Sequence, residues 1–151
     1  MGEAAFYHLT RRAAADVLPP LLTRALAQGW RVVVRGTDAE RLRALDLALW
    51  EGDGFLPHGL AGGPHDARQP VLLTTGPEVA ECVMAVDGAR VTPHEVEAAA
   101  RVCLIFDGDD DGVLAQARGQ WAALTGAGCA ARYWSEESGR WQQKAARNVS
   151  G

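Results

Sequence analysis

The chain has 151 residues, which predicts a single domain large enough to bury a hydrophobic core. Its composition, 48% hydrophobic and 23% charged, is that of a folded globular protein rather than a disordered one. The net charge of −4 argues against a protein that binds nucleic acid over its whole surface. No run of about 18 apolar residues occurs, so no membrane span is expected, and the early acid in Met1-Gly2-Glu3 does not fit a secretion signal.

The cysteines and the lysine narrow the class of protein further. Cys82, Cys103 and Cys129 are widely spaced, and each lies within an apolar run. Neither disulfide nor zinc-ligand spacing is present, so we expect buried, reduced thiols in a cytoplasmic protein. Lys144 is the only lysine, which excludes P-loop or Schiff-base chemistry elsewhere in the chain.

The start of the chain predicts a strand, a helix and a second strand. The short apolar run at 6–9 predicts the first strand. Because Pro19 and Pro20 fit only in the first turn of a helix, the helix is expected to begin near Leu18. The β-branched run within 31–35 predicts a strand that is buried on both faces.

A second helix and a long connection follow. Thr37 with Glu40 three residues later is a capping box, and the helix that it opens reaches Trp50. The loop at 51–70 is long for a compact domain, so it is a place to look for function. The remaining predicted elements are strands at 71–74, 82–86 and 102–106, a short helix capped by Thr92, Pro93 and Glu95, a last helix beginning at 109–111, a strand at 129–134 and a hairpin return at 140–144.

Strands that alternate with helices predict an α/β fold whose mostly parallel sheet is covered by helices on both sides. A nucleotide site is disfavoured, because the turn at 10–13 has no glycine that would let a phosphate approach the backbone. Gly126–Ala131 matches G-x-G-x-x-A but stands between a helix and a strand, the reverse of the order that phosphate binding needs. The run at 107–112 imitates a calcium loop, yet the closing Glu is replaced by Arg118, so an acidic helix start is favoured.

Two histidines and a carboxylate lie in the long loop. His58, His65 and Asp66 suggest a small metal-dependent hydrolase as the alternative function. No third histidine, thiolate or nucleophile elbow accompanies them, so we expect the two histidines instead to cap and hydrogen-bond the loop backbone. No catalytic residue, metal or cofactor is predicted.

An arginine and several aromatic residues form a different kind of candidate site. Arg118 and Trp121 are three residues apart and so are neighbours on one helix face. Trp50 and Phe55 bracket the end of the second helix and the start of the long loop. Core packing is the more common role for any single aromatic residue, but an arginine beside aromatic rings suits an anionic, aromatic peptide terminus.

Several segments resemble the chi subunit family of bacterial DNA polymerase III, over essentially the whole chain. The most distinctive is Trp50 followed by Phe55-Leu56-Pro57-His58. The resemblance implies a Rossmann-like, three-layer α/β/α fold, with residues 1–144 as a single chi-like domain. Residues 145–151 are expected to be a frayed tail, because chain ends are often poorly ordered. The other segments that carry it are Phe6-Tyr7-His8-Leu9, Gly29-Trp30-Arg31-Val32, Leu45–Trp50, Gly59-Leu60-Ala61-Gly62 and Ala117–Gly128.

The same resemblance implies a non-catalytic adaptor. Chi proteins join the clamp-loader complex, in some bacteria through a psi subunit, and contact DNA only indirectly. They bind the acidic, Phe-terminated C-terminal tail of single-stranded-DNA-binding protein, and the family's tail-binding positions fall here on Trp50, Phe55, Arg118 and Trp121. One departure is Leu114, where some members have a second cation, a role that Arg41 or Arg43 is a candidate to fill.

Overall fold

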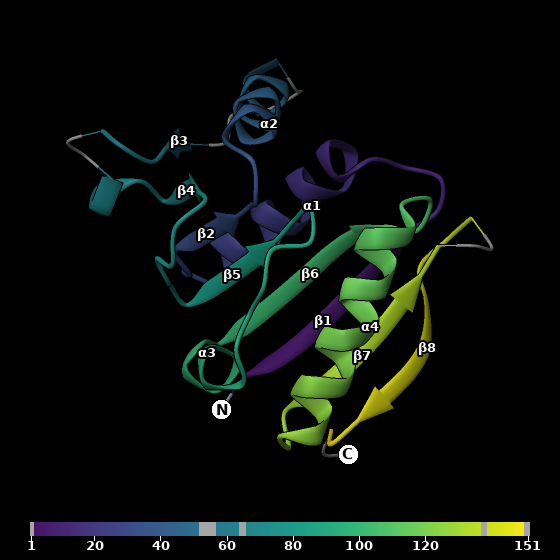
Figure 1. Cartoon of the computed structure of the whole chain (residues 1–151). Helices are drawn as coiled ribbons and strands as arrows, with labels where there is room; N and C mark the ends of the chain where they lie inside the picture. Colours follow the sequence, from purple (N-terminus) through teal and green to yellow (C-terminus); the bar gives the residue numbers. More distant parts are fainter. Residues whose placement is uncertain (1, 52–56, 64–65, 137–138, 150–151) are drawn as a thin grey trace.

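The computed structural model describes residues 2–51, 57–63, 66–136 and 139–149, built around one sheet (Figure 1). Its strands are β1 (Glu3–Leu9), β2 (Val32–Arg35), β3 (Gly59–Leu60), β4 (Val71–Thr74), β5 (Cys82–Ala85), β6 (Arg101–Asp107), β7 (Ala130–Ser135) and β8 (Gln142–Arg147). Its helices are α1 (Ala14–Ala27), α2 (Ala39–Glu51), α3 (Pro93–Ala98) and α4 (Asp111–Gly126), with a short 3-10 helix, η1, at Asp66–Arg68. In the order β3-β4-β2-β5-β6-β1-β7-β8, every neighbouring pair is parallel except β7 with β8. The predicted α/β class with a mostly parallel sheet is confirmed.

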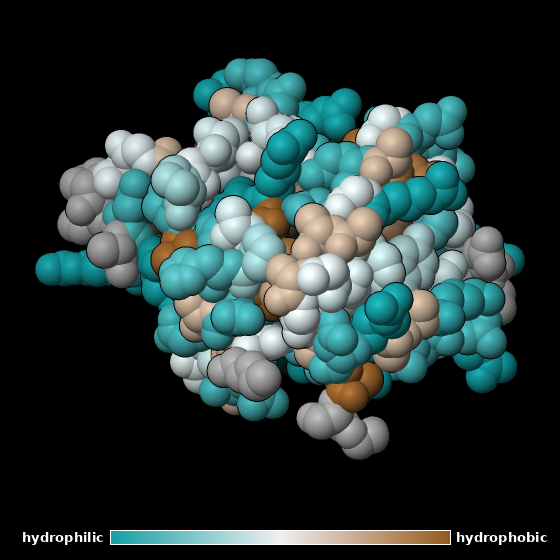
Figure 2. Space-filling model, turned by 60° about the horizontal axis from the view of Figure 1, so that its bottom comes forward, coloured by the Kyte–Doolittle hydropathy of each residue, from teal (hydrophilic) through white to brown (hydrophobic). Residues whose placement is uncertain are grey.

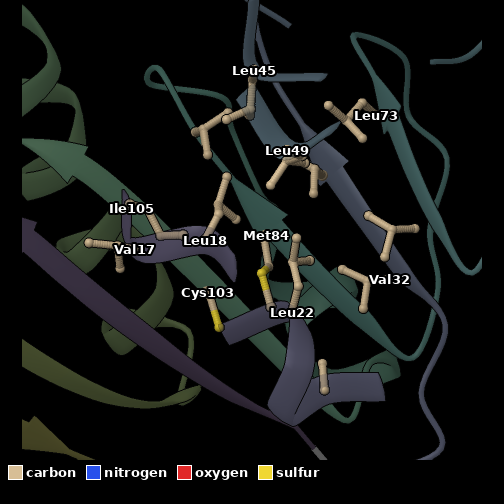
Figure 3. Close-up of a cluster of buried hydrophobic side chains, with 14 of the residues drawn as sticks. Val17, Leu18, Leu22, Val32, Leu45, Leu49, Leu73, Met84, Cys103 and Ile105 are labelled. Atoms are coloured by element: carbon tan, nitrogen blue, oxygen red, sulfur yellow. The ribbon is translucent and has the colours of Figure 1, made fainter. Parts of the chain in front are cut away.

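Helices cover both faces of the sheet, which confirms the three-layer arrangement. α1 and α2 pack on one face through a core cluster that includes Leu18 and Leu45 (Figure 3). α3 and α4 pack on the other face, where Val96 and Leu124 join Phe6 of β1. Figure 1 shows α4 in front of the sheet and α1 behind it. The two core clusters bury the alternate side chains of the central strands, which explains their almost continuous apolar sequences.

α1 begins one turn earlier than the prolines predicted. Pro19 and Pro20, expected in the first turn of a helix that starts near Leu18, lie inside α1. The Asp16 carboxylate accepts a hydrogen bond from the Ala13 N–H at 3.1 Å, which satisfies a backbone donor at the N-terminus of α1. The prolines leave two backbone carbonyls in the first turn without a helical hydrogen bond. Because the residues there are half-buried or exposed, water can reach these carbonyls, and the free-energy cost of the two prolines is reduced.

The two capping boxes have different outcomes. The box of Thr92 and Glu95 is confirmed by reciprocal hydrogen bonds of 3.1 and 2.9 Å. The predicted box of Thr37 and Glu40 does not form, because Asp38 caps α2 instead and accepts the Glu40 N–H at 2.8 Å. Aspartate is at least as good an N-cap as threonine, so the start of α2 shifts by one residue.

The C-terminal strand runs further than predicted. A hairpin return was expected at 140–144 with a frayed tail at 145–151. β8 instead runs to Arg147, which pairs with Ala131 of β7. Ala145 lies opposite Tyr133, and the side-chain amide of Asn148 donates to two backbone carbonyls at 3.0 Å. These hydrogen bonds join residues that are distant in the sequence, so the local sequence does not reveal them, and they hold the segment in place.

The long connection at 51–70 contains β3, which pairs in parallel with β4, and η1. All three cysteines are buried and unbridged, as predicted. None of the described helices has the length and apolar character needed to cross a bilayer. On the face drawn in Figure 2, apolar residues form small areas between hydrophilic ones rather than one continuous patch.

Candidate peptide-binding site

α4 presents the first part of the predicted site. The Asp110 side chain caps the helix by accepting the Val113 N–H at 3.0 Å. Ala117 and Leu124 are buried against the sheet, so the neighbouring stripe of the helix faces outward. Arg118, on that stripe, is exposed.

Trp121 is half-buried over a set of packed rings. Its ring meets Phe6 edge-on, with centroids 5.2 Å apart, and meets Tyr133 edge-on at 5.9 Å. His8 stacks on Phe106 at 5.2 Å and hydrogen-bonds the Tyr133 hydroxyl through Nδ1 at 2.8 Å. We call Phe6, His8, Phe106, Trp121 and Tyr133 the aromatic platform. Core packing therefore buries most of Trp121, and a smaller part of this side chain remains accessible.

A glycine makes room for the platform. A Cβ on Gly108 would lie 2.0 Å from Nε2 of His8, so the histidine ring occupies the space that any other residue would need. The sequence predicted Phe6–Leu9 as a strand and as one of the segments of the family resemblance, but it assigned neither His8 nor Tyr133 to the site. Their association depends on the pairing of β1 with β7, which residue spacing does not indicate.

Arg118 carries a charge that no neighbouring carboxylate neutralises among the described residues. Its guanidinium has no hydrogen bond or ion pair within the part of the chain that the structure describes. Leu114, one turn earlier on α4, and Trp121, one turn later, both pack partly against the α4-side core. The arrangement is an exposed cation between an aliphatic and an aromatic side chain.

The structure does not bring Trp50 to this place. Trp50 lies at the end of α2 and is 52% exposed, with its ring centroid 4.2 Å from that of His58. α2 covers the opposite face of the sheet from α4, and β5, β6 and β1 separate β2 from β7. Phe55 lies outside the described residues. The candidate site therefore divides into two places, one on α4 and one at the end of α2.

The two cations suggested as substitutes at Leu114 both lie on α2, and each forms an ion pair. Arg43 pairs with Glu40 at 3.0 Å on α2, and Arg41 reaches Asp87 at 3.4 Å. Arg43 is therefore engaged on α2 itself, whereas Arg41 and Asp87 line the same pocket as Asp110 and Val113 at the start of α4. Of the two, Arg41 is the cation near the first turn of α4, and its charge is already paired.

The geometry of the histidine loop gives the hydrolase alternative no support. His58 is buried, and its Nε2 lies 3.2 Å from both the carbonyl oxygen and Oδ1 of Asp46. The Asp66 carboxylate accepts the N–H groups of Gly62 and Gly63 at 2.9 and 3.0 Å, so it is used within the loop. The backbone contact expected of the loop histidines is seen at His58. His65 lies outside the described residues. Across the described ranges, no three His, Cys, Asp or Glu side chains are placed to hold a metal ion.

The loop after β1 explains why this α/β edge does not suit a nucleotide. Oε1 of Glu136 accepts the backbone N–H groups of Thr10, Arg11 and Arg12 at 3.2, 2.8 and 2.8 Å. Its Oε2 accepts from Nε of Arg12 at 2.9 Å. Burial raises the pKa of Glu136, but the backbone donors and Arg12 lower it further, to about 2. The chain's own carboxylate thus occupies the position after the first strand where such folds hold a phosphate.

The strand order and the helices on both faces define a Rossmann-like α/β protein, with an exposed arginine on the outer side of α4. A family model described as DNA polymerase III chi subunit, HolC, matches residues 1–132, which include the whole of α4. The chain belongs to this family, and it is therefore a non-catalytic accessory protein of DNA polymerase III. A comparison with curated proteins finds no match.

Proposed function

We propose that this chain is an adaptor that binds the acidic C-terminal tail of single-stranded-DNA-binding protein through α4 during DNA replication. The observation that supports the proposal is the exposed guanidinium of Arg118, which has no ion pair among the described residues and lies beside Trp121 and the aromatic platform. A terminal carboxylate would form charge-assisted hydrogen bonds with Arg118, while a terminal phenyl ring would pack on Trp121 and Leu114.

A second cation lies near the C-terminal end of α4, away from the aspartates at 109–111 that begin the helix. Arg147 of β8 is exposed and lies opposite Ala131, which is buried on the α4 side of the sheet. Directly opposed residues of an antiparallel pair share a face, so Arg147 adds positive charge on the α4 side. This local charge on a chain of net charge −4 predicts binding that weakens as salt increases.

An adaptor needs a second surface, and the end of α2 is our candidate for it. Leu47 and Trp50 are one turn apart and are 57% and 52% exposed, on the face of the sheet opposite α4. We assign this pair to the clamp-loader side of the complex, in the cytoplasm, through a psi subunit where one exists. The tail and the clamp loader would then be held at the same time.

The test is a titration of the chain with a fluorescent peptide of the acidic, Phe-terminated tail, at low and at moderate salt. Arg118→Ala is expected to weaken binding at least about tenfold, the usual effect of losing one hydrogen bond to a charged group. Arg43→Ala is the matched control, because Arg43 is an exposed helix arginine remote from α4. Full affinity in Arg118→Ala, or equal binding of a peptide without its terminal Phe, would reject this site.

A further inference from the structure

A small cavity lies under the second half of α1, on the face of the sheet opposite α4. Its volume is about 160 Å³, which is close to that of cavities known to hold a benzene ring, about 150 Å³. The proposed function makes no use of it. The residues that line it are Tyr7, Leu21, Arg24, Ala25, Gln28, Trp30, Cys82, Met84, Arg101 and Cys103.

Small side chains leave this space open. α1 contributes Ala25 at the point where Cys82 and Cys103 come up from β5 and β6. Ala5 of β1 lies directly opposite Cys103 and is also small. Figure 3 shows Cys103 and Met84 beneath α1, on the side of the sheet that carries Leu22. These small side chains do not fill the space between α1 and the strands, and the cavity remains.

Two arginines reach the cavity without an anionic partner. Nε of Arg101 is buried and has no hydrogen-bond partner, and no side-chain bond is made by Arg24 among the described residues. The acid that lies opposite Arg101 on β1 is Glu3, but its carboxylate is bonded to Arg132 at 2.8 Å. A buried N–H donor without an acceptor is costly, so this cavity favours an anion that would complete it.

The remaining walls favour a ring. Leu21, Ala25 and Met84 are apolar, and Trp30 supplies an aromatic surface. The Tyr7 hydroxyl has no partner among the described residues, and burial raises the pKa of Tyr7 to about 12, so this group stays a neutral donor. An apolar pocket with a few convergent polar groups is the usual form of a small-molecule site.

We propose that this cavity binds a small aromatic carboxylate. The ring lies among Leu21, Ala25 and Trp30, and the carboxylate accepts hydrogen bonds from Arg101 and Arg24. The site is on the opposite face of the sheet from Arg118, so it is independent of the peptide site.

Benzoate is the probe for the test, followed by NMR of the nitrogen-labelled chain. Saturable shifts are expected at the Trp30 indole N–H and the Gln28 amide, with a dissociation constant of about 1 mM for a ligand of this size. Arg101→Gln and Arg24→Gln are each expected to weaken binding about tenfold, and Leu21→Trp to abolish it by filling the ring position. Arg43→Gln, an exposed arginine elsewhere, serves as the control and should bind as the wild type does.

Each outcome decides the proposal. Absence of saturation by benzoate, or shifts spread over the whole surface, would overturn it. Equal binding of benzyl alcohol would overturn the role of the two arginines, and equal binding of acetate would overturn the ring site. If thermal melting shows that Arg101→Gln does not fold, Arg24→Gln and Leu21→Trp still give the answer.

Discussion

The buried carboxylate of Glu136 allows a sharp test of how this fold is stabilised. Glu136 is 2% exposed, and its oxygens accept four hydrogen bonds from the loop between β1 and α1. Glu136→Gln keeps the size of the side chain but removes its charge. Its amide oxygen can still accept the three backbone N–H groups, but its amide N–H₂ then faces the Arg12 guanidinium, which is also a donor. The variant should fold, because the hydrophobic clusters are untouched, but with lower stability.

The expected loss follows from the pKa of Glu136, which falls from its ordinary value of 4.5 to about 2 in the folded chain. Each unit of pKa corresponds to about 1.4 kcal/mol, so the ionised carboxylate contributes about 3 kcal/mol to the free energy of unfolding. A lowered pKa stabilises the fold above the unfolded value, and this contribution disappears as pH falls from about 4.5 towards 2.

The assay is urea unfolding of wild type and Glu136→Gln between pH 7 and pH 3. The difference in free energy of unfolding should be about 3 kcal/mol at pH 7 and should shrink steadily below pH 4.5. Glu40→Gln, which removes an exposed carboxylate paired with Arg43, is the control and should change little at any pH. Equal stability of the two proteins at pH 7, or a difference independent of pH, would refute the reasoning.

Three further substitutions test other parts of the structure. Arg35→Met should lower the free energy of unfolding by about 3 to 5 kcal/mol in urea, because it leaves the Glu95 carboxylate, now bonded at 2.7 and 3.0 Å, without its buried partner. Trp50→Ala should retain wild-type affinity for the tail peptide in the anisotropy titration, since α2 lies on the other face from α4; a tenfold loss would mean that the two places form one site. Leu114→Arg should tighten tail binding by up to about fivefold at low salt, and the gain should vanish at high salt; an unchanged affinity at low salt would show that the acidic part of the tail does not pass this turn of α4.

The order of the elements could be predicted from the sequence because the signals are local. The continuous apolar run of β2 and the box of Thr92 and Glu95 depend only on residues within a few positions of one another. The prediction was wrong where two neighbouring residues could each serve as the N-cap, as with Thr37 and Asp38 at the start of α2. It was also wrong where contacts distant in sequence decided the outcome, as at the end of β8.

The candidate site shows the limit of reasoning from motifs more clearly. Trp50 and Arg118 were grouped because the family resemblance carries both, but the face of the sheet on which a helix lies depends on its crossover connection. The link between Glu136 and Thr10 spans 126 positions and has no local signal, although it determines the chemistry of the loop after β1.

Glu136 also bears on why the proposed binding site lies on a helix face. In open α/β sheets, ligands usually bind outside the carboxyl ends of the strands, where loop N–H groups and helix N-termini attract anions. Here those N–H groups are used by the chain's own carboxylate, whose pKa of about 2 keeps it charged at neutral pH. An anionic partner must then be bound by side-chain cations instead, and Arg118 on α4 is one without an internal acceptor among the described residues. A guanidinium on a helix can bind the C-terminal carboxylate of a peptide, whereas a loop of backbone N–H groups suits a phosphate. Because the Glu136 carboxylate already occupies the loop, a peptide ligand is favoured over a nucleotide.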